Sequence, residues 1–136
     1  MADFNNYILD ACVLINYIYE ESGFEKVEKF LQLGFENKIC LIMSAVNYGE
    51  VMQHLYKNKN FDEAKIISET IINEFNIEFF VAGLEEADQA GFYKSKGGIA
   101  YMDGFVLALA KKKNAKILTL DKEFLKYQGE FEVEML

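Results

Sequence analysis

The sequence predicts an α/β fold, namely a three-layer α/β/α sandwich around a sheet of four or five mainly parallel strands. Short apolar runs alternate along the chain with segments in which apolar residues recur every three or four positions, a pattern typical of strands separated by helices. Such strands pair in parallel through right-handed crossovers. Because 136 residues is the size of one domain, we expect a single domain over residues 1–136.

The first part of the chain is predicted to form one strand and two helices. The apolar run Asn6–Asp10 ends in an acid, and a helix is expected behind it over Val13–Glu20. Ser22 and Gly23 end this helix, because both residues favour turns. Phe24–Glu36 then alternates apolar steps with outward charges, which indicates an amphipathic helix on one face of the sheet.

The middle of the chain returns to the sheet twice. Lys38–Met43 has an apolar centre and is predicted to be a buried strand. Ser44 is a suitable N-cap for a helix over Ala45–Tyr56. A second helix is predicted over Phe61–Phe75, and the β-branched and aromatic run Ile77–Val81 is predicted to be the next strand.

The last part of the chain contains the most apolar helix. Leu84–Lys94 is a mixed helix, whereas Tyr101–Lys113 is apolar on nearly every side, which indicates a helix buried within the fold. A strand, a short helical turn and a terminal strand are expected to follow, over Ala115–Leu120, residues 121–125 and Phe131–Met135.

The composition excludes several classes of protein. The net charge of -8 arises from 22 acids and 14 bases, all of the bases being lysine, so overall charge disfavours nonspecific attachment to nucleic acid. No stretch approaches the ~20 apolar residues of a membrane helix, and the start of the chain does not resemble a secretory signal. Cys12 and Cys40 do not make a disulfide framework. We therefore expect a cytoplasmic protein that does not associate with a membrane.

Three aspartates stand where chemistry is expected in this fold. Ligands collect beyond the carboxyl ends of parallel strands, and Asp10 and Asp121 each end a predicted strand. Asp103 lies on the apolar helix, where an ionised carboxylate is costly unless it is paired or binds a metal. Simpler alternatives remain: helix caps for Asp10 and Asp121, and a first-turn position favoured by the helix dipole for Asp103.

The acidic residues of the helices carry weaker evidence. Glu50 shares the polar side of its helix with Asn47, His54 and Lys57, and alone it is expected to be solvated. His54 could contact substrate or carry a proton, although an ordinary helix-surface histidine is the simpler interpretation. Glu85-Glu86 is expected to be an ordinary exposed pair, and Lys111, Lys112 and Lys113 are expected to complement a helix dipole.

Convergence of Asp10, Glu50, Asp103 and Asp121 would require a counter-charge. Two carboxylates ~4 Å apart repel by about 4 kcal/mol at an effective dielectric constant of about 20, so several of them cannot stay ionised unassisted. Oxygen ligands without histidine or cysteine at suitable spacing favour Mg²⁺ or Mn²⁺ over zinc. Such a site suits phosphodiester hydrolysis.

Four segments carry a family resemblance: Tyr7–Ile15, Ser44–Val51, Tyr101–Ala110 and Ile117–Phe124. In their order and approximate spacing they resemble the signature blocks of PIN-domain ribonucleases, and most closely those of the VapC-like toxins of toxin-antitoxin pairs. The resemblance implies a PIN-like fold and an Mg²⁺- or Mn²⁺-dependent endoribonuclease. It further implies a homodimer that a cognate antitoxin silences by laying a helix and tail across the active-site groove.

The resemblance also assigns roles to residues. It implies that Asp10, Glu50, Asp103 and Asp121 hold the metal and that Thr119 supports them by hydrogen bonding. Candidates for a local basic rim that contacts RNA, with plain solvated lysines as the alternative, are Lys57, Lys59, Lys94 and Lys96.

Cys12 is a departure from the family pattern. Members commonly carry Ser, Thr or Asn at this position, and a thiol is a poor hydrogen-bond donor, so we expect a looser orientation of Asp10 or reliance on backbone donors. A PIN fold with a decayed metal site, kept only as a protein-binding module, therefore stays open, as does a non-toxin PIN nuclease in RNA processing. A phosphoaspartyl enzyme fits less well, because the dehalogenase type needs a second Asp where Cys12 stands. Four aromatic residues of the first two helices either belong to the core or line a groove that binds an antitoxin helix: Tyr17, Tyr19, Phe24 and Phe30.

Overall fold

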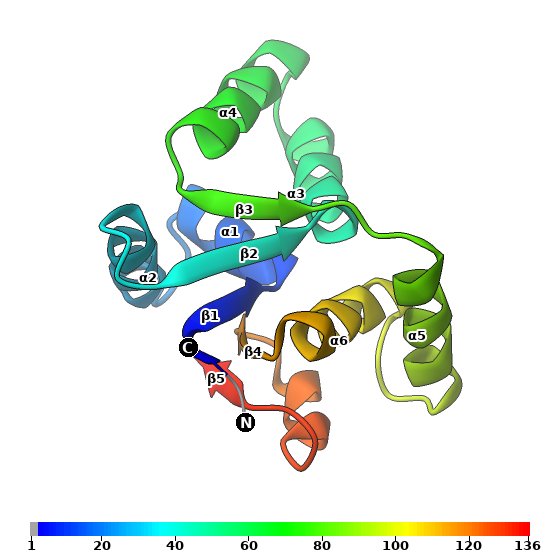
Figure 1. The fold of residues 1–136 in the computed structure, drawn as a ribbon. Coiled ribbons are helices and arrows are strands. Elements are labelled where there is room, and N and C mark those ends of the chain that lie inside the picture. Colours follow the sequence, from blue (N-terminus) through cyan, green and yellow to red (C-terminus); the bar gives the residue numbers. More distant parts are fainter. Residues whose placement is uncertain (1–2) are drawn as a thin grey trace.

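The computed structural model describes residues 3–136, with side chains from residue 5 onward, and its sheet confirms the predicted α/β/α sandwich (Figure 1). The sheet has five strands, all parallel, in the order β3-β2-β1-β4-β5. The strands are β1 (Asp3–Leu9), β2 (Cys40–Ser44), β3 (Ile77–Phe80), β4 (Ala115–Thr119) and β5 (Val133–Met135). The helices are α1 (Ala11–Ile18), α2 (Phe24–Phe35), α3 (Ala45–Asn58), α4 (Phe61–Asn73), α5 (Leu84–Ser95), α6 (Tyr101–Lys113) and the 3₁₀ helix η1 (Lys122–Tyr127).

The predicted elements are present, and their ends differ by a few residues. The first helix, predicted over Val13–Glu20, begins at Ala11, immediately after the acid that ends the β1 run, and ends at Ile18. The fourth, predicted to reach Phe75, ends at Asn73. Apolar spacing locates the buried face of a helix but not its last turn, where backbone hydrogen bonding decides the end.

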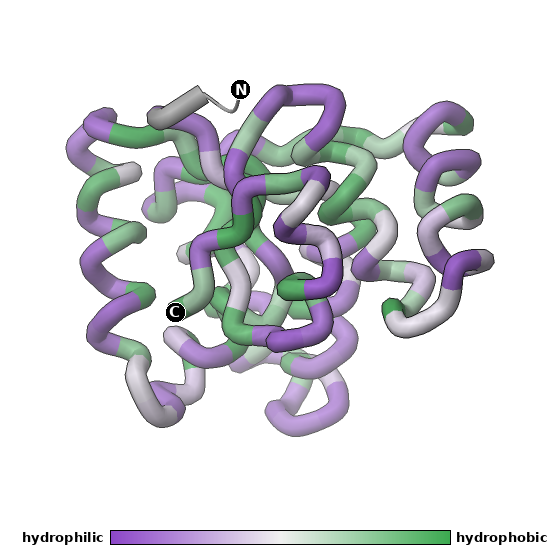
Figure 2. The backbone as a smooth tube through the Cα atoms, turned by 90° about the horizontal axis from the view of Figure 1, so that it is seen from below, coloured by the Kyte–Doolittle hydropathy of each residue, from purple (hydrophilic) through white to green (hydrophobic). Residues whose placement is uncertain are grey.

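The two faces of the sheet bury two separate cores. Successive strand residues point to opposite faces, so Tyr7 and Leu9 pack with α1 to α4, whereas Ile8 packs with α5, α6 and η1. Tyr17, Tyr19 and Phe30 pack against the first core, which supports their interpretation as core residues, and Phe24 is half-buried. In Figure 2 the flanking helices alternate between hydrophilic and hydrophobic stretches, as expected of helices that bury one side.

Helix α6 is the buried helix predicted from its apolar sequence. Every residue from Asp103 to Ala110 is buried, so α6 lies between the sheet and α5. The crossing of α5 and α6 is close: a Cβ added to Gly104 would lie 2.8 Å from the Cα of Ala90. A glycine at this position therefore lets the two helix backbones approach.

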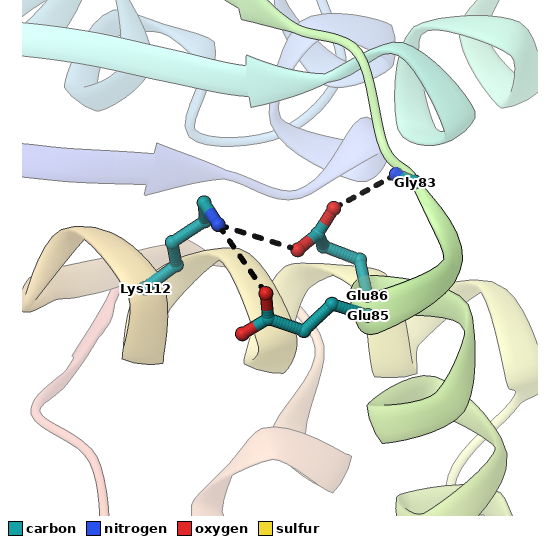
Figure 3. A network of polar contacts seen from close by, with 4 residues as sticks. All are labelled: Gly83, Glu85, Glu86 and Lys112. Atoms are coloured by element: carbon teal, nitrogen blue, oxygen red, sulfur yellow. Dashed lines mark hydrogen bonds and ion pairs between the residues drawn. The ribbon is translucent and has the colours of Figure 1, made fainter.

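The expectation that Glu86 is exposed was wrong. Its side chain accepts a hydrogen bond from the Gly83 N–H at 2.8 Å at the start of α5, and the residue is only 5% exposed (Figure 3). Lys112 Nζ of α6 lies 3.7 Å from carboxylate oxygens of both Glu85 and Glu86. A helical wheel of α5 cannot show this cation, because it belongs to another helix.

Within residues 3–136, no helix combines the length and the apolar character that crossing a membrane requires.

Candidate metal centre

Four predicted acids line one cavity of about 400 Å³ at the carboxyl ends of the strands. Asp10 directly follows β1, and Asp121 follows β4, its parallel neighbour in the sheet, so both acids emerge at the same edge. Helix α3 starts where β2 ends and brings Glu50, and the first turn of α6 brings Asp103. The cavity is lined by Asp10, Ala11, Cys12, Ile15, Glu50, Gln53, His54, Lys57, Asp103 and Asp121.

Asp10 is the most buried acid of the cavity, with 4% of its surface exposed. Its Oδ2 accepts hydrogen bonds from the Thr119 hydroxyl at 2.8 Å and from the Cys12 thiol at 3.1 Å. Burial raises the pKa of Asp10, and the charge of Asp121 adds to this rise, whereas the hydrogen bonds from Cys12, Thr119 and the Ala11 backbone oppose it. The carboxylate is thus held by side-chain donors as well as by the backbone.

Cys12 takes the place of the polar residue common in the family and still donates to Asp10. Burial first, and then the charge of Asp10, raises the pKa of the thiol to about 12, so it stays protonated at neutral pH. The sulfur also accepts a 3.5 Å hydrogen bond from the Leu120 N–H. The expected reliance on backbone donors is therefore only partial, because Thr119 and Cys12 both contribute.

Thr119 lies between two of the acids, Asp10 and Asp121, and hydrogen-bonds to both residues. It is the last residue of β4 and is fully buried; its hydroxyl donates to Asp10 and accepts a 2.9 Å hydrogen bond from the Asp121 N–H. Asp121 Oδ1 in turn accepts a 2.9 Å hydrogen bond from the Glu123 N–H and caps η1. The capping interpretation of Asp121 therefore holds alongside its place in the cavity.

Glu50 is half-buried rather than solvated, and Asn47, predicted to be on the solvated side of the same helix, is completely buried. Asn47 Nδ2 donates to Glu50 Oε1 at 2.8 Å and to the Met102 carbonyl of α6 at 3.0 Å. Burial raises the pKa of Glu50, with a smaller contribution from Asp10 in the same direction. The polar side of α3 faces α6 here, which the helical wheel alone could not show.

Asp103 carries the clearest electrostatic signature of the cavity. Burial first, and then the charges of Asp10, Glu50 and Asp121, raise its pKa to about 7, while a hydrogen bond from the Ala100 backbone opposes the rise. Three acids on three other elements thus act on one carboxyl group. A cluster of this kind is stable in its ionised form only with a cation present.

Glu123 is a further acid that the sequence interpretation did not include. Ligand oxygens of Asp103, Asp121 and Glu123 all lie within 4.8 Å of one another, close enough to share one ion, whereas Asp10 and Glu50 line the cavity outside this group. The sequence did contain a signal for Glu123, because it follows the end of β4 two residues after Asp121. An all-carboxylate donor set fits a hard divalent cation such as Mg²⁺ or Mn²⁺.

The four candidate lysines are not equivalent. Lys57 lines the cavity, and among the residues that the structure describes it is the one lysine that does so. Lys59 instead lies 4.9 Å from the centre of the Tyr19 ring, and Lys96 lies 4.9 Å from that of Phe92. Lys94, like Lys59 and Lys96, does not line the cavity.

The comparison with known families bears directly on this arrangement. The family model described as PIN domain matches residues 7–130, nearly the whole chain. The chain belongs to the PIN-domain family. This confirms the resemblance read from the four sequence segments, and the matched range includes every acid of the cavity. No curated protein sequence matches the chain.

Solved structures of PIN-domain toxin-antitoxin proteins share the fold. The VapBC2 structure from Rickettsia felis, bound to a DNA fragment from its promoter, gives a TM-score of 0.74 at 15% identity, over 96% of this chain and 98% of that chain. VapC20 from Mycobacterium tuberculosis, described as a sarcin-ricin loop cleaving toxin, gives 0.73 at 12% identity, over 92% and 95%. FitAcB from Neisseria gonorrhoeae gives 0.66 at 22% identity, over 93% and 95%. At these identities the likeness establishes the fold.

Proposed function

We propose that the protein is a metal-dependent endoribonuclease that hydrolyses RNA phosphodiester bonds and is the toxin of a toxin-antitoxin pair. The observation that carries the proposal is the cavity shared by Asp10, Glu50, Asp103 and Asp121, in which burial first, and then the neighbouring acids, raise the pKa of Asp103. Membership of the PIN-domain family supports a nuclease over other proteins that bind divalent cations.

The residues that would hold Mg²⁺ or Mn²⁺ are the four predicted acids, to which we add Glu123 because its carboxylate groups with Asp103 and Asp121. When bound, the cation supplies Lewis acidity at the phosphate and lowers the pKa of the attacking water. Thr119 and Cys12 orient Asp10 through its Oδ2.

Few positively charged side chains are placed to contact the phosphates of RNA. The chain contains no arginine, so it lacks the bidentate phosphate contacts that arginine provides. Lys57 is the best-placed candidate to approach a phosphate, because it lines the same cavity as the acids. Lys59, Lys94 and Lys96 would contact RNA only farther from the cavity.

The structural relatives support an antitoxin as the proposed partner. A toxin-antitoxin complex from Klebsiella pneumoniae resembles this chain with a TM-score of 0.70 at 14% identity, over 95% of this chain and 96% of that chain. We infer a cognate antitoxin that covers the cavity, a homodimeric toxin and a cytoplasmic site of action. Expression of the protein alone should arrest growth of a host, and co-expression with the antitoxin should restore it; harmless expression of active nuclease would indicate the non-toxin alternative.

Cleavage of a mixed RNA pool, with the product ends mapped, tests the activity. We expect cleavage in Mg²⁺ or Mn²⁺ that stops in EDTA and is abolished by Asp103→Asn. The matched control is Asp88→Asn, which neutralises an exposed acid of α5 outside the cavity and should cleave normally. Undiminished cleavage by Asp103→Asn would overturn the assignment of the cavity, and a wild-type protein that neither binds the cation nor cleaves RNA would favour a protein-binding module with a decayed metal site.

A further inference from the structure

We infer that Asn47 is a positioning residue that fixes Glu50 relative to Asp103 for cation binding, an inference that rests on the proposed function of the cavity. Asn47 is 0% exposed and lies in the first turn of α3, three residues before Glu50. Its Nδ2 donates to Glu50 Oε1 at 2.8 Å and to the Met102 carbonyl at 3.0 Å. Met102 directly precedes Asp103, so one amide group joins the two helices that deliver two of the acids.

The chemistry of these two contacts requires a neutral double donor. A carboxylate oxygen and a carbonyl oxygen are both acceptors only, so the atom facing them must be the amide nitrogen. A lysine could also hold Glu50, but its positive charge would compete with a cation for the same carboxylate. Serine or threonine has one O–H and could serve one acceptor only. Asparagine satisfies both acceptors without adding charge to the cavity.

Without Asn47, we expect the Glu50 side chain to rotate out of the cavity. Glu50 is half-buried and shares the cavity with Asp10 and Asp103, whose charges repel its own and favour rotation of the side chain toward solvent. The Met102 carbonyl, in contrast, does not depend on Asn47, because a carbonyl in the first turn of a helix accepts from the N–H four residues on. The contact with α6 therefore serves the placement of Glu50 more than the integrity of α6.

Asn47 also carries a cost that an apolar residue would avoid. Its Oδ1 is buried and has no hydrogen-bond partner within the described part of the chain. Such an unpaired buried atom is unfavourable, and an apolar side chain of similar size would remove it. Asn16 of α1 provides a matched control: it is buried, donates to the Ser22 carbonyl at 3.0 Å, also has an unpaired Oδ1, and does not line the cavity.

The test measures Mn²⁺ affinity by calorimetric titration, together with folding. Asn47→Leu should weaken Mn²⁺ binding by about tenfold, the size of effect typical of residues that orient metal ligands. Its melting temperature in EDTA should stay close to that of the wild type. Asn16→Leu should bind Mn²⁺ like the wild type. If Asn47→Leu does not fold, Asn47→Ser, whose hydroxyl is too short to join both partners, replaces it with the same expectation.

A double-mutant cycle separates positioning from a general structural effect. If Asn47 acts through Glu50, adding Asn47→Leu to Glu50→Gln should leave Mn²⁺ affinity no lower than in Glu50→Gln alone. Full additivity of the two losses, or wild-type affinity in Asn47→Leu, would overturn the inference even if the wild type cleaves RNA. Conversely, a wild type that shows the cycle but cleaves no RNA would overturn the proposed activity and leave the role of Asn47 intact.

Discussion

Replacing Asp103 by asparagine in the absence of metal should stabilise the protein at alkaline pH. The pKa of Asp103 is raised from 3.8 to about 7, chiefly by burial and then by Asp10, Glu50 and Asp121. A carboxyl group whose pKa is higher in the folded state favours folding at low pH and loses this contribution as the pH rises from about 4 to about 7. Above pH 7 the ionised group costs up to about 4 kcal/mol, which Asp103→Asn removes.

The assay is urea denaturation in EDTA at two pH values. At pH 8 we expect Asp103→Asn to exceed the wild type by up to about 4 kcal/mol, or on the order of 10 °C in melting temperature. Near pH 5 the gain should fall to less than half, because the folded wild type is then protonated at Asp103. Added Mg²⁺ should stabilise the wild type more than the variant. The reasoning fails if Asp103→Asn is less stable at pH 8, or if its gain does not depend on pH.

Three other substitutions test the side chains that contact two buried acids, Asp10 and Glu86. Thr119→Val removes the hydroxyl that donates to Asp10 and should cost about 1–3 kcal/mol in urea denaturation; an unchanged midpoint would contradict this. Cys12→Ser supplies a stronger donor and should tighten Mn²⁺ binding in a calorimetric titration, whereas weaker binding would show that the thiol itself is required. Lys112→Met leaves buried Glu86 without its cation and should lower the free energy of unfolding by about 1 kcal/mol in low salt, an effect that high salt should reduce.

The fold was predictable because the spacing of apolar residues in each strand and helix indicates which side of that element is buried. The alternation of strands and helices also predicts parallel strands, and therefore places Asp10 and Asp121 at one edge of the sheet. The cavity confirms that placement in space. The metal, the RNA and the roles of these acids remain predictions that the experiments above address.

What sequence could not predict depends on contacts between elements. Asn47 and Glu86 both lie on helix faces that a helical wheel presents as solvated, yet both are buried. Each contacts a residue of α6, Met102 in the case of Asn47 and Lys112 in the case of Glu86. The carboxylates of Glu123 in η1 and Asp103 in α6 lie within 4.8 Å of each other, although the two residues belong to different elements. The periodicity of a sequence describes one helix at a time, so it cannot predict a polar contact that a second helix provides.

The missing side chain at Gly104 limits how this family member can vary. Gly104 follows Asp103 directly, and it leaves no room for a side chain between α6 and Ala90 of α5. Even one methyl group there would lie 2.8 Å from the Ala90 Cα, so α5 and the first turn of α6, which carries Asp103, would have to move apart. We therefore expect only glycine to be tolerated at position 104. The side of α6 that faces α5 must lack a side chain there so that the first turn of α6 can hold Asp103 in the cavity.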